Sequence, residues 1–293
     1  MVTSKRKSLL FCAAAYLIAA VLSVLGARWV GGADLLFAAA IADLIATVVV
    51  FVGSVVVNNS SLYDPYWSVA PLCIAAYWLS LGAGLPLRSI LVLGLLLAWG
   101  VRLTWNWAAR WRGLSHEDWR YADYRKLGAP LYWAVSLLGF HLFPTVLVFM
   151  GCLSVYVVLV AHATGLQVLD IAAVLVTGAA LLVEARADSE LRVFLRSKPR
   201  AEEVLETGLW AWTRHPNYFG EVLFWWGLYL FGLAANPRYW WTIVGPLSIT
   251  FLFLFVSVPM MERHMEAGHP GYAERKRLRS PFLPWPKSQP RDG

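Results

Sequence analysis

The segment GLWAWTRHPNYFGE at residues 208–221 combines a cation, an imidazole, an amide and a carboxylate at the start of an apolar run. Pro216 suits the first position of a helix, where its missing N–H costs nothing. The N-terminus of such a helix presents free N–H groups and a positive dipole to an anion. We therefore predict an anion-binding site here, and a helix cap with interfacial aromatic residues is the alternative. The candidate residues are Arg214, His215, Asn217, Tyr218 and Glu221.

A second candidate site follows from the spacing of charged residues in EARADSELRVFLRSKPR, residues 184–200. Asp188, Arg192 and Arg196 lie four residues apart, so a helix would carry them on one face. The planar guanidinium of arginine binds phosphate oxygens in pairs, which favours a phosphate-bearing ligand. Salt bridges within the helix are the alternative.

The polar stretch NNSSLYDPYW, residues 58–67, lies between two apolar runs and contains the candidate catalytic residues Asp64 and Tyr66. A carboxyl group beside aromatic rings at a membrane boundary is partly desolvated. Desolvation raises its pKa and makes it a usable acid near neutral pH. The alternative is a polar loop that turns at Asp64 and Pro65.

Arg102, Asn106 and Arg110 follow one another at four-residue spacing, so one helix face would carry all three. A charged residue inside an apolar run is costly and usually faces a cavity, which predicts an anion-binding wall at Arg102 and Asn106. Snorkelling of Arg102 toward the interface is the alternative. Arg263 and His264 end the last apolar run and precede a basic cluster. They are further candidates for a functional site, with contact to anionic lipid as the alternative.

The three cysteines, Cys12, Cys73 and Cys152, each lie inside an apolar run and form no C-x-x-C pair. The six histidines show no H-E-x-x-H spacing. The sequence therefore predicts neither a disulfide framework nor a metal site.

The elements that must position these residues are membrane spans. Hydrophobic residues make up 59% of the 293-residue chain and charged residues 15%, whereas globular chains lie near 45–50% and about 25%. Eight apolar runs are long enough to cross a bilayer. They cover residues 8–27, 35–57, 67–86, 89–109, 131–161, 168–187, 218–235 and 239–261. The fifth run is too long for a simple span and contains His141 and Pro144, so a count of seven is also possible. We predict an all-α, polytopic membrane helix bundle with seven or eight transmembrane helices.

Lysine and arginine placement predicts the orientation. With eight spans, one side receives the N-terminal Lys-Arg-Lys, the loops at 110–128 and 188–216, and the C-terminal tail. The other side receives only Arg28, Arg88 and Arg238. Because basic loops stay on the cytoplasmic side, both termini are expected there. The net charge of +7 then needs no nucleic-acid partner. We predict one integral membrane domain over residues 1–293, with a catalytic and cofactor-binding half at about 168–286.

Three pieces carry a family resemblance: RADSELRVFLRSKP, TRHPNYFGE and the ending GYAERKR with PFLPW. Together they resemble the steroid 5-alpha-reductase family, and more closely its bacterial branch, described as a domain of unknown function. The resemblance covers about Asn58 to Trp285 and implies a location in the bacterial inner membrane. The R-H-P-x-Y element before a glutamate-bearing span is also similar to isoprenylcysteine carboxyl methyltransferases and phospholipid methyltransferases.

The resemblance implies an NADPH site in the cytoplasmic half of the bundle. Asp188, Arg192 and Arg196 match the acid-and-arginine helix around the cofactor, and Asn217 and Glu221 match the residues at the nicotinamide end. Arg263 and His264 fall near the C-terminal basic and histidine positions of the family.

On the substrate side, the resemblance matches Asp64 to the glutamate that helps protonate substrate. The carboxylate is one carbon shorter here, and Trp99 stands where the family has its tyrosine partner. Tyr63 or Tyr66 is then the expected phenol.

The expected function is NADPH-dependent reduction of a carbon–carbon double bond in a lipid, such as a steroid or other enone. The alternatives are a SAM-dependent lipid or isoprenylcysteine-type methyltransferase and a non-enzymatic lipid-binding protein. The arginine-rich helix favours NADPH, because NADPH carries phosphates whereas SAM carries a cationic sulfonium. The expected partners are a lipid-like substrate and membrane lipids, with no protein partner predicted.

Overall fold

The computed structural model describes residues 4–30, 34–82, 84–161, 165–198, 200 and 203–284. Within these ranges the regular structure is helical, and one isolated bridge joins Thr213 to Ser280. Contacts group the chain into two compact units, Met1–Ala163 (unit 1) and Thr164–Gly293 (unit 2). This grouping does not decide whether the units fold independently, so the single membrane domain stays a prediction.

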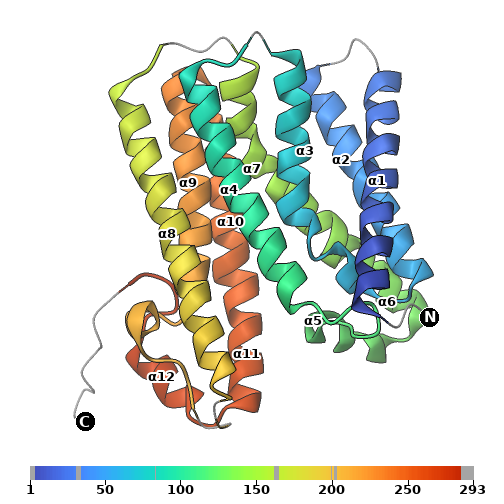
Figure 1. Ribbon diagram of the computed structural model, residues 1–293, viewed down its shortest axis with the longest axis vertical. Helices are drawn as coiled ribbons and strands as arrows, with labels where there is room; N and C mark the ends of the chain where they lie inside the picture. Colours follow the sequence, from blue (N-terminus) through green and yellow to red (C-terminus); the bar gives the residue numbers. More distant parts are fainter. Residues whose placement is uncertain are drawn as a thin grey trace. The chain divides into compact units, whose positions relative to one another are not determined.

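Unit 1 is built from long apolar helices (Figure 1). They are α1 (Lys5–Val30), α2 (Leu35–Val56), α3 (Tyr66–Leu81), α4 (Leu87–Arg110), α6 (Ala129–Val135) and α7 (Phe143–Leu159). Helix α2 begins after Asp34, whose side chain accepts a hydrogen bond from the backbone N–H of Leu36. Buried alanines on both α1 and α2, including Ala19 and Ala39, let the two backbones approach closely.

The long fifth run is continuous. Helices α6 and α7 are joined by η3 (Ser136–Leu142), a π-helical turn. Its His141 is fully buried and its Nδ1 lies 2.8 Å from the carbonyl oxygen of Ser136. The π turn keeps the backbone helical just before Pro144, which occupies the first turn of α7.

Short segments close one end of unit 1. The turn η1 (Ser60–Tyr63) joins α2 to α3, and α5 (Trp119–Ala122) and η2 (Arg125–Leu127) follow α4. The Asn59 amide donates to the carbonyl of Leu114 at 3.0 Å, and Glu117 accepts from the Ser60 N–H at 2.8 Å. These contacts fix the loop from which α3 and its first residue, Tyr66, begin.

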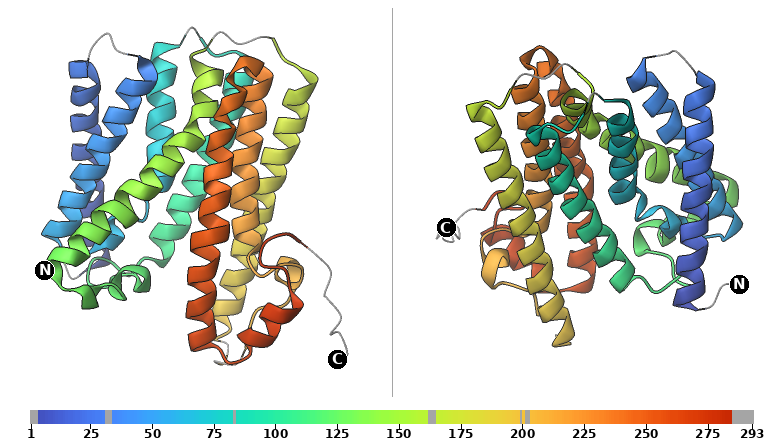
Figure 2. Two further views of the ribbon diagram at one scale, coloured as in Figure 1. Left: turned by 180° about the vertical axis from the view of Figure 1, so that it is seen from behind. Right: turned by 45° about the horizontal axis from the view of Figure 1, so that its top comes forward.

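Unit 2 contains α8 (Val168–Arg196), η4 (Gly208–Ala211), α9 (Pro216–Ala235), η5 (Pro237–Ile243), α10 (Val244–Phe251), η6 (Leu252–Ser257), α11 (Val258–Gly268) and α12 (Tyr272–Leu278). Figure 2 shows α10 and α11 as one continuous rod, which η6 joins through a π-helical turn. Helices α8 and α9 pack tightly, because a Cβ on Gly220 would lie only 3.1 Å from the carbonyl oxygen of Ala180.

The prediction of an all-α membrane bundle is confirmed. Seven helical segments of the described chain are long and apolar enough to cross a membrane. Each of the eight predicted apolar runs contains a helix, and the third corresponds to α3, which has 16 residues. Helix α3 is shorter than each of these seven segments. The cytoplasmic placement of the termini and the bacterial inner membrane stay predictions.

Candidate functional site

Tyr66 and Asp43 form a buried hydrogen-bonded pair in unit 1. The Tyr66 hydroxyl donates to Asp43 Oδ1 at 2.6 Å and lies 2.9 Å from the Asp43 carbonyl oxygen. Their exposed fractions are only 4% and 6%. Asp43 lies within α2, and a carboxylate inside a span is costly unless it is hydrogen-bonded. The pair is therefore a hydrogen-bonded polar site among otherwise apolar helices.

The same pair lines a cavity of about 120 Å³ between α1, α2 and α3. Most of the remaining wall is alanine and other apolar side chains. A cavity with an apolar wall and a few convergent polar groups is the usual form of a small-molecule site. An apolar ligand with one oxygen atom could place that atom at Tyr66.

A row of hydroxyl groups surrounds the pair. Thr47 Oγ1 lies 2.9 Å from Thr145 Oγ1, which lies 2.8 Å from the Tyr63 hydroxyl. The ring of Tyr63 is stacked on that of Tyr66, with 5.0 Å between the centroids. These contacts hold the Tyr66 phenol in one orientation.

Asp64 occupies a different environment from Tyr66. It accepts a hydrogen bond from Tyr121 at 2.6 Å and one from Arg120 at 3.2 Å, which also forms an ion pair with it. Burial raises the pKa of Asp64 to about 6, although Arg120 and Tyr121 oppose the rise. Asp64 is absent from the cavity wall, and its carboxylate ties the loop before α3 to α5. Of the two predicted catalytic residues, only Tyr66 faces the cavity.

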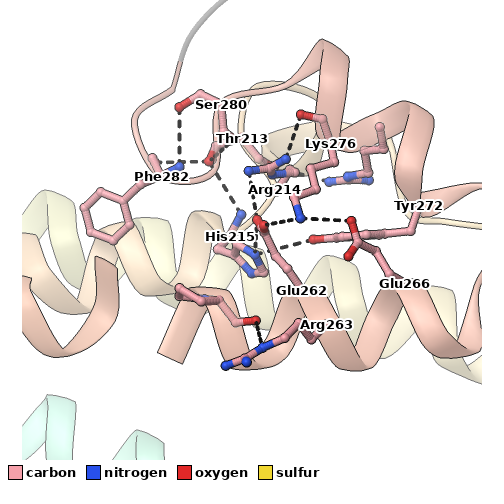
Figure 3. A network of polar contacts seen from close by, with 12 residues as sticks. Thr213, Arg214, His215, Glu262, Arg263, Glu266, Tyr272, Lys276, Ser280 and Phe282 are labelled. Atoms are coloured by element: carbon pink, nitrogen blue, oxygen red, sulfur yellow. Dashed lines mark hydrogen bonds and ion pairs between the residues drawn. The ribbon is translucent and has the colours of Figure 1, made fainter. Parts of the chain in front are cut away.

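In unit 2, Glu262 of α11 is the centre of a buried polar network (Figure 3). Arg214 Nη2 lies 2.8 Å from Glu262 Oε1, and His215 Nε2 lies 3.4 Å from the same oxygen. The Tyr272 hydroxyl lies 3.5 Å from His215 Nε2. Burial lowers the pKa of His215, and its contact with Glu262 offsets part of that shift. The network thus joins the loop before α9 to α11 and α12.

Helix α12 also clamps the preceding loop. Arg275 donates to the carbonyl oxygens of Leu205, Trp210 and Thr213, at 2.9 Å for Trp210 and 3.4 Å for Thr213. The backbone N–H of Arg214 donates to the carbonyl of Ser280 at 3.0 Å. The C-terminal segment therefore holds the Arg214–His215 loop at the start of α9.

The start of α9 has free capacity for an anion. No side chain in the described part of the chain caps this helix N-terminus, so its first N–H groups are available to a ligand. Arg214 Nε and Arg275 Nε are buried without a hydrogen-bond partner in the described ranges. These donors fit a phosphate-bearing group, which binds to helix N-termini and guanidinium groups.

The other predicted cofactor residues are spread over several surfaces. Asp188 and Arg192 are half-buried on α8, and Arg196 is exposed near its C-terminal end. Arg102 and Asn106 lie on α4 of unit 1, half-buried and buried respectively.

Three predicted cofactor residues, Asn217, Tyr218 and Glu221, lie in the first two turns of α9. Asn217 is half-buried in the first turn, and the ring of Tyr218 is stacked on His215 at 5.2 Å. Glu221 is buried and accepts a hydrogen bond from Trp225 Nε1 at 2.9 Å.

Arg263 and His264 are both exposed on α11. Arg263 donates to the carbonyl of Pro259 on its own helix, and Figure 3 shows its guanidinium turned away from the Glu262 carboxylate. The polar network therefore contains Glu262, whereas Arg263 bonds within its own helix.

Residues 50–278 match the model of a family described as a protein of unknown function, DUF1295. The chain belongs to the DUF1295 family. It is also 25% identical over 229 residues to an uncharacterized protein of Schizosaccharomyces pombe. That alignment covers 68% of this chain and 65% of the relative, so the chain spans slightly less than two thirds of the relative's length. No solved structure matches.

The DUF1295 match begins within α2 and ends with α12. Tyr66 and the Glu262 network lie inside the matched region, and Asp43 lies shortly before it. Sequence analysis missed Asp43, although a carboxylate inside an apolar run was a usable signal. It also missed the central place of Glu262, because no sequence pattern relates it to Arg214.

Proposed function

We propose that the protein is an NADPH-dependent membrane reductase that acts on a carbon–carbon double bond in a lipid-like substrate. The observation that carries the proposal is the Tyr66–Asp43 hydrogen bond at the wall of an apolar cavity. A reductase of this kind needs a hydrogen-bond or proton donor for a neutral carbonyl conjugated to the double bond. The resemblance to steroid 5-alpha-reductases supports the same reaction class.

In this proposal, the carbonyl oxygen of the substrate replaces Asp43 as the acceptor of the single Tyr66 O–H hydrogen bond, and Asp43 orients the phenol until the substrate binds. Moving electron density toward that oxygen makes the far carbon of the double bond electrophilic. Stacking by Tyr63 and the hydroxyls of Thr47 and Thr145 limit the motion of the donor. Pre-orientation of this kind lowers the cost of reaching the reactive geometry.

NADPH supplies a hydride when it is bound. In unit 2, Arg192, Arg196, Arg214 and the first N–H groups of α9 would hold its phosphates. Asn217 and Glu221 would contact its nicotinamide end, as the resemblance implies. The proposal places cofactor binding on the cytoplasmic face, where NADPH is available.

The cavity also bears on the methyltransferase alternative. An isoprenylcysteine-type methyl acceptor is a carboxylate, and the carboxyl group of Asp43 would repel it. The uncapped N-terminus of α9 suits the phosphates of NADPH better than a cationic sulfonium. We therefore favour the reductase over the methyltransferase.

Thermal-shift titration of the purified full-length protein with NADPH and with SAM tests the cofactor. Binding at about 100 times Kd adds roughly 2.7 kcal/mol to the free energy of unfolding. We expect NADPH to raise the melting midpoint and NADH, which lacks the 2′-phosphate, to raise it less. Stabilisation by SAM with no effect of NADPH would contradict the proposal.

A further inference from the structure

The cavity between α1, α2 and α3 is elongated. Its wall on α1 extends from Tyr16 to Ala27, and its wall on α3 extends from Tyr66 to Tyr77. Each stretch covers eleven residue steps, or about 16 Å of helix at 1.5 Å per residue. The cavity volume of about 120 Å³ is small beside the roughly 300–1,000 Å³ of most sites for compact ligands. A slender molecule fits this shape better than a fused-ring one.

Seven alanines give the cavity its width, and small side chains leave room for one chain between the helices. They are Ala19, Ala20, Ala27, Ala39, Ala42, Ala46 and Ala70. Ser23 also lines the wall, but its hydroxyl donates to the carbonyl of Ala42 at 2.8 Å and is satisfied within the protein. The wall beyond Asp43 and Tyr66 therefore offers mainly hydrocarbon contact.

The buried polar groups lie at one end. Tyr66 donates to Asp43, and the Tyr16 hydroxyl donates to the carbonyl of Leu62 at 3.1 Å. Among the residues that the structure describes, no lysine, arginine or histidine lines the cavity, so an anionic headgroup would meet a carboxyl group without a compensating cation in the described wall. Such burial of an unpaired charge is strongly unfavourable. The end group of the ligand must therefore be uncharged and able to accept a hydrogen bond.

The cavity opens sideways between the helices. Val24 of α1 is 49% exposed, and Cys73 of α3 is also exposed. Both residues line the cavity, and exposed apolar positions in the middle of a span face lipid tails. A ligand dissolved in the bilayer has direct access through this opening.

We propose that this cavity binds a linear isoprenoid or acyl chain that ends in an uncharged carbonyl, with the carbonyl at Tyr66. Reduction of this ligand rests on the proposed function, whereas its binding does not, because binding needs no cofactor. It narrows the substrate class from lipids in general to chain-type lipids and excludes both fatty-acid anions and steroids.

The test is a thermal-shift comparison of three probes with the full-length protein in detergent, without cofactor. The probes are farnesal, a linear enal; palmitate, a linear anion; and androstenedione, a steroid enone. At about ten times Kd, farnesal should raise the melting midpoint by roughly 3–6 °C. Palmitate and androstenedione should leave it unchanged.

Two matched variants of α1 exclude effects of the probe on the micelle. Ala20→Phe places a ring in the cavity mouth, whereas Ala13→Phe places one at an exposed position that does not line the cavity. Ala20→Phe should abolish the farnesal shift and Ala13→Phe should retain it. Tyr66→Phe should weaken farnesal binding roughly two- to tenfold.

The two proposals fail in different ways. A shift with androstenedione, or none with farnesal, overturns the linear-chain proposal while reductase activity can still stand. A farnesal shift that Ala20→Phe leaves intact also overturns it. Farnesal binding in a protein that NADPH does not stabilise supports the chain-type site and removes the reductase.

Discussion

Tyr66, the first residue of α3, donates a 2.6 Å hydrogen bond to Asp43 within α2. The bond joins two helices through groups that water would otherwise solvate, in a layer where most neighbours are apolar. A hydrogen bond to a charged group contributes about 1.5–3 kcal/mol, and an unpaired buried partner is costly. The pair therefore has both a structural and a chemical consequence, and substitutions can separate them.

Tyr66→Phe keeps the ring and removes only the hydroxyl. If the phenol is the donor, turnover of an enone substrate should fall by about 10²–10⁴-fold, while NADPH binding is unchanged. Steady-state rates per folded molecule and a cofactor titration measure the two effects. Tyr124→Phe, at an exposed position outside the cavity wall, serves as the matched control and should keep normal turnover. Normal turnover in Tyr66→Phe would remove it from the reaction.

Glu262 and Glu266 allow a paired test of burial on α11. Glu262 is buried and contacts Arg214 and His215, whereas Glu266 is exposed and pairs with Lys276 at 2.9 Å. Glu262→Ala should lower the free energy of unfolding by about 3–5 kcal/mol, because it leaves a buried cation unpaired. Glu266→Ala should cost about 0–1 kcal/mol. Denaturant melts of both variants measure the difference, and equal losses would contradict a buried network.

The membrane bundle was predictable because a span requires about 20 apolar residues, a signal that each run carries by itself. The chemistry was harder to predict. Asp64 and Tyr66 are two residues apart, which suggested that they act together as the acid, but Asp64 directly follows the turn η1 while Tyr66 begins α3. Their side chains consequently find different partners.

The true partner of Tyr66 lies on another helix, as does Glu262 for Arg214. Such pairings depend on how helices pack, and packing is decided by close approaches such as that of Gly220 to Ala180. A single sequence contains the residues but not these approaches. A carboxylate inside a span was the one local signal for Asp43, and the sequence has no comparable signal for the clamp of Arg275.

Asp64 should contribute to the pH dependence of the protein's stability. Its pKa is raised to about 6, chiefly by burial, above an unfolded value near 3.9. The native state therefore binds this proton more tightly, so its contribution to stability is complete below about pH 4 and is lost as pH rises through about 6. Asp64→Asn should remove that part of the pH dependence from melting midpoints measured between pH 4 and 7.

The same variant separates a structural from a catalytic Asp64. Asn keeps an oxygen that can accept from Arg120 and Tyr121 and removes a charge that burial disfavours, so we expect Asp64→Asn not to lower the melting midpoint at neutral pH. Turnover per folded molecule should stay near that of the unmodified protein. A loss of 10²-fold or more with an unchanged midpoint would return Asp64 to the catalytic site.

Arg196 tests the cofactor site at the end of α8. It is exposed and lies one helical turn after Arg192, so its guanidinium can contact a phosphate without breaking a buried network. Arg196→Ala should weaken NADPH binding by roughly 10- to 150-fold, the equivalent of about 1.5–3 kcal/mol for one charge-assisted contact.

Arg186→Ala is the matched control on the same helix, because Arg186 is 70% exposed and pairs with Glu190 at 3.0 Å. Both variants remove one positive charge, so a general electrostatic effect would weaken NADPH binding equally in the two. Isothermal titration at two salt concentrations distinguishes a direct contact from such an effect, since only the direct contact keeps most of its difference at high salt. Equal affinities in both variants would take Arg196 out of the cofactor site.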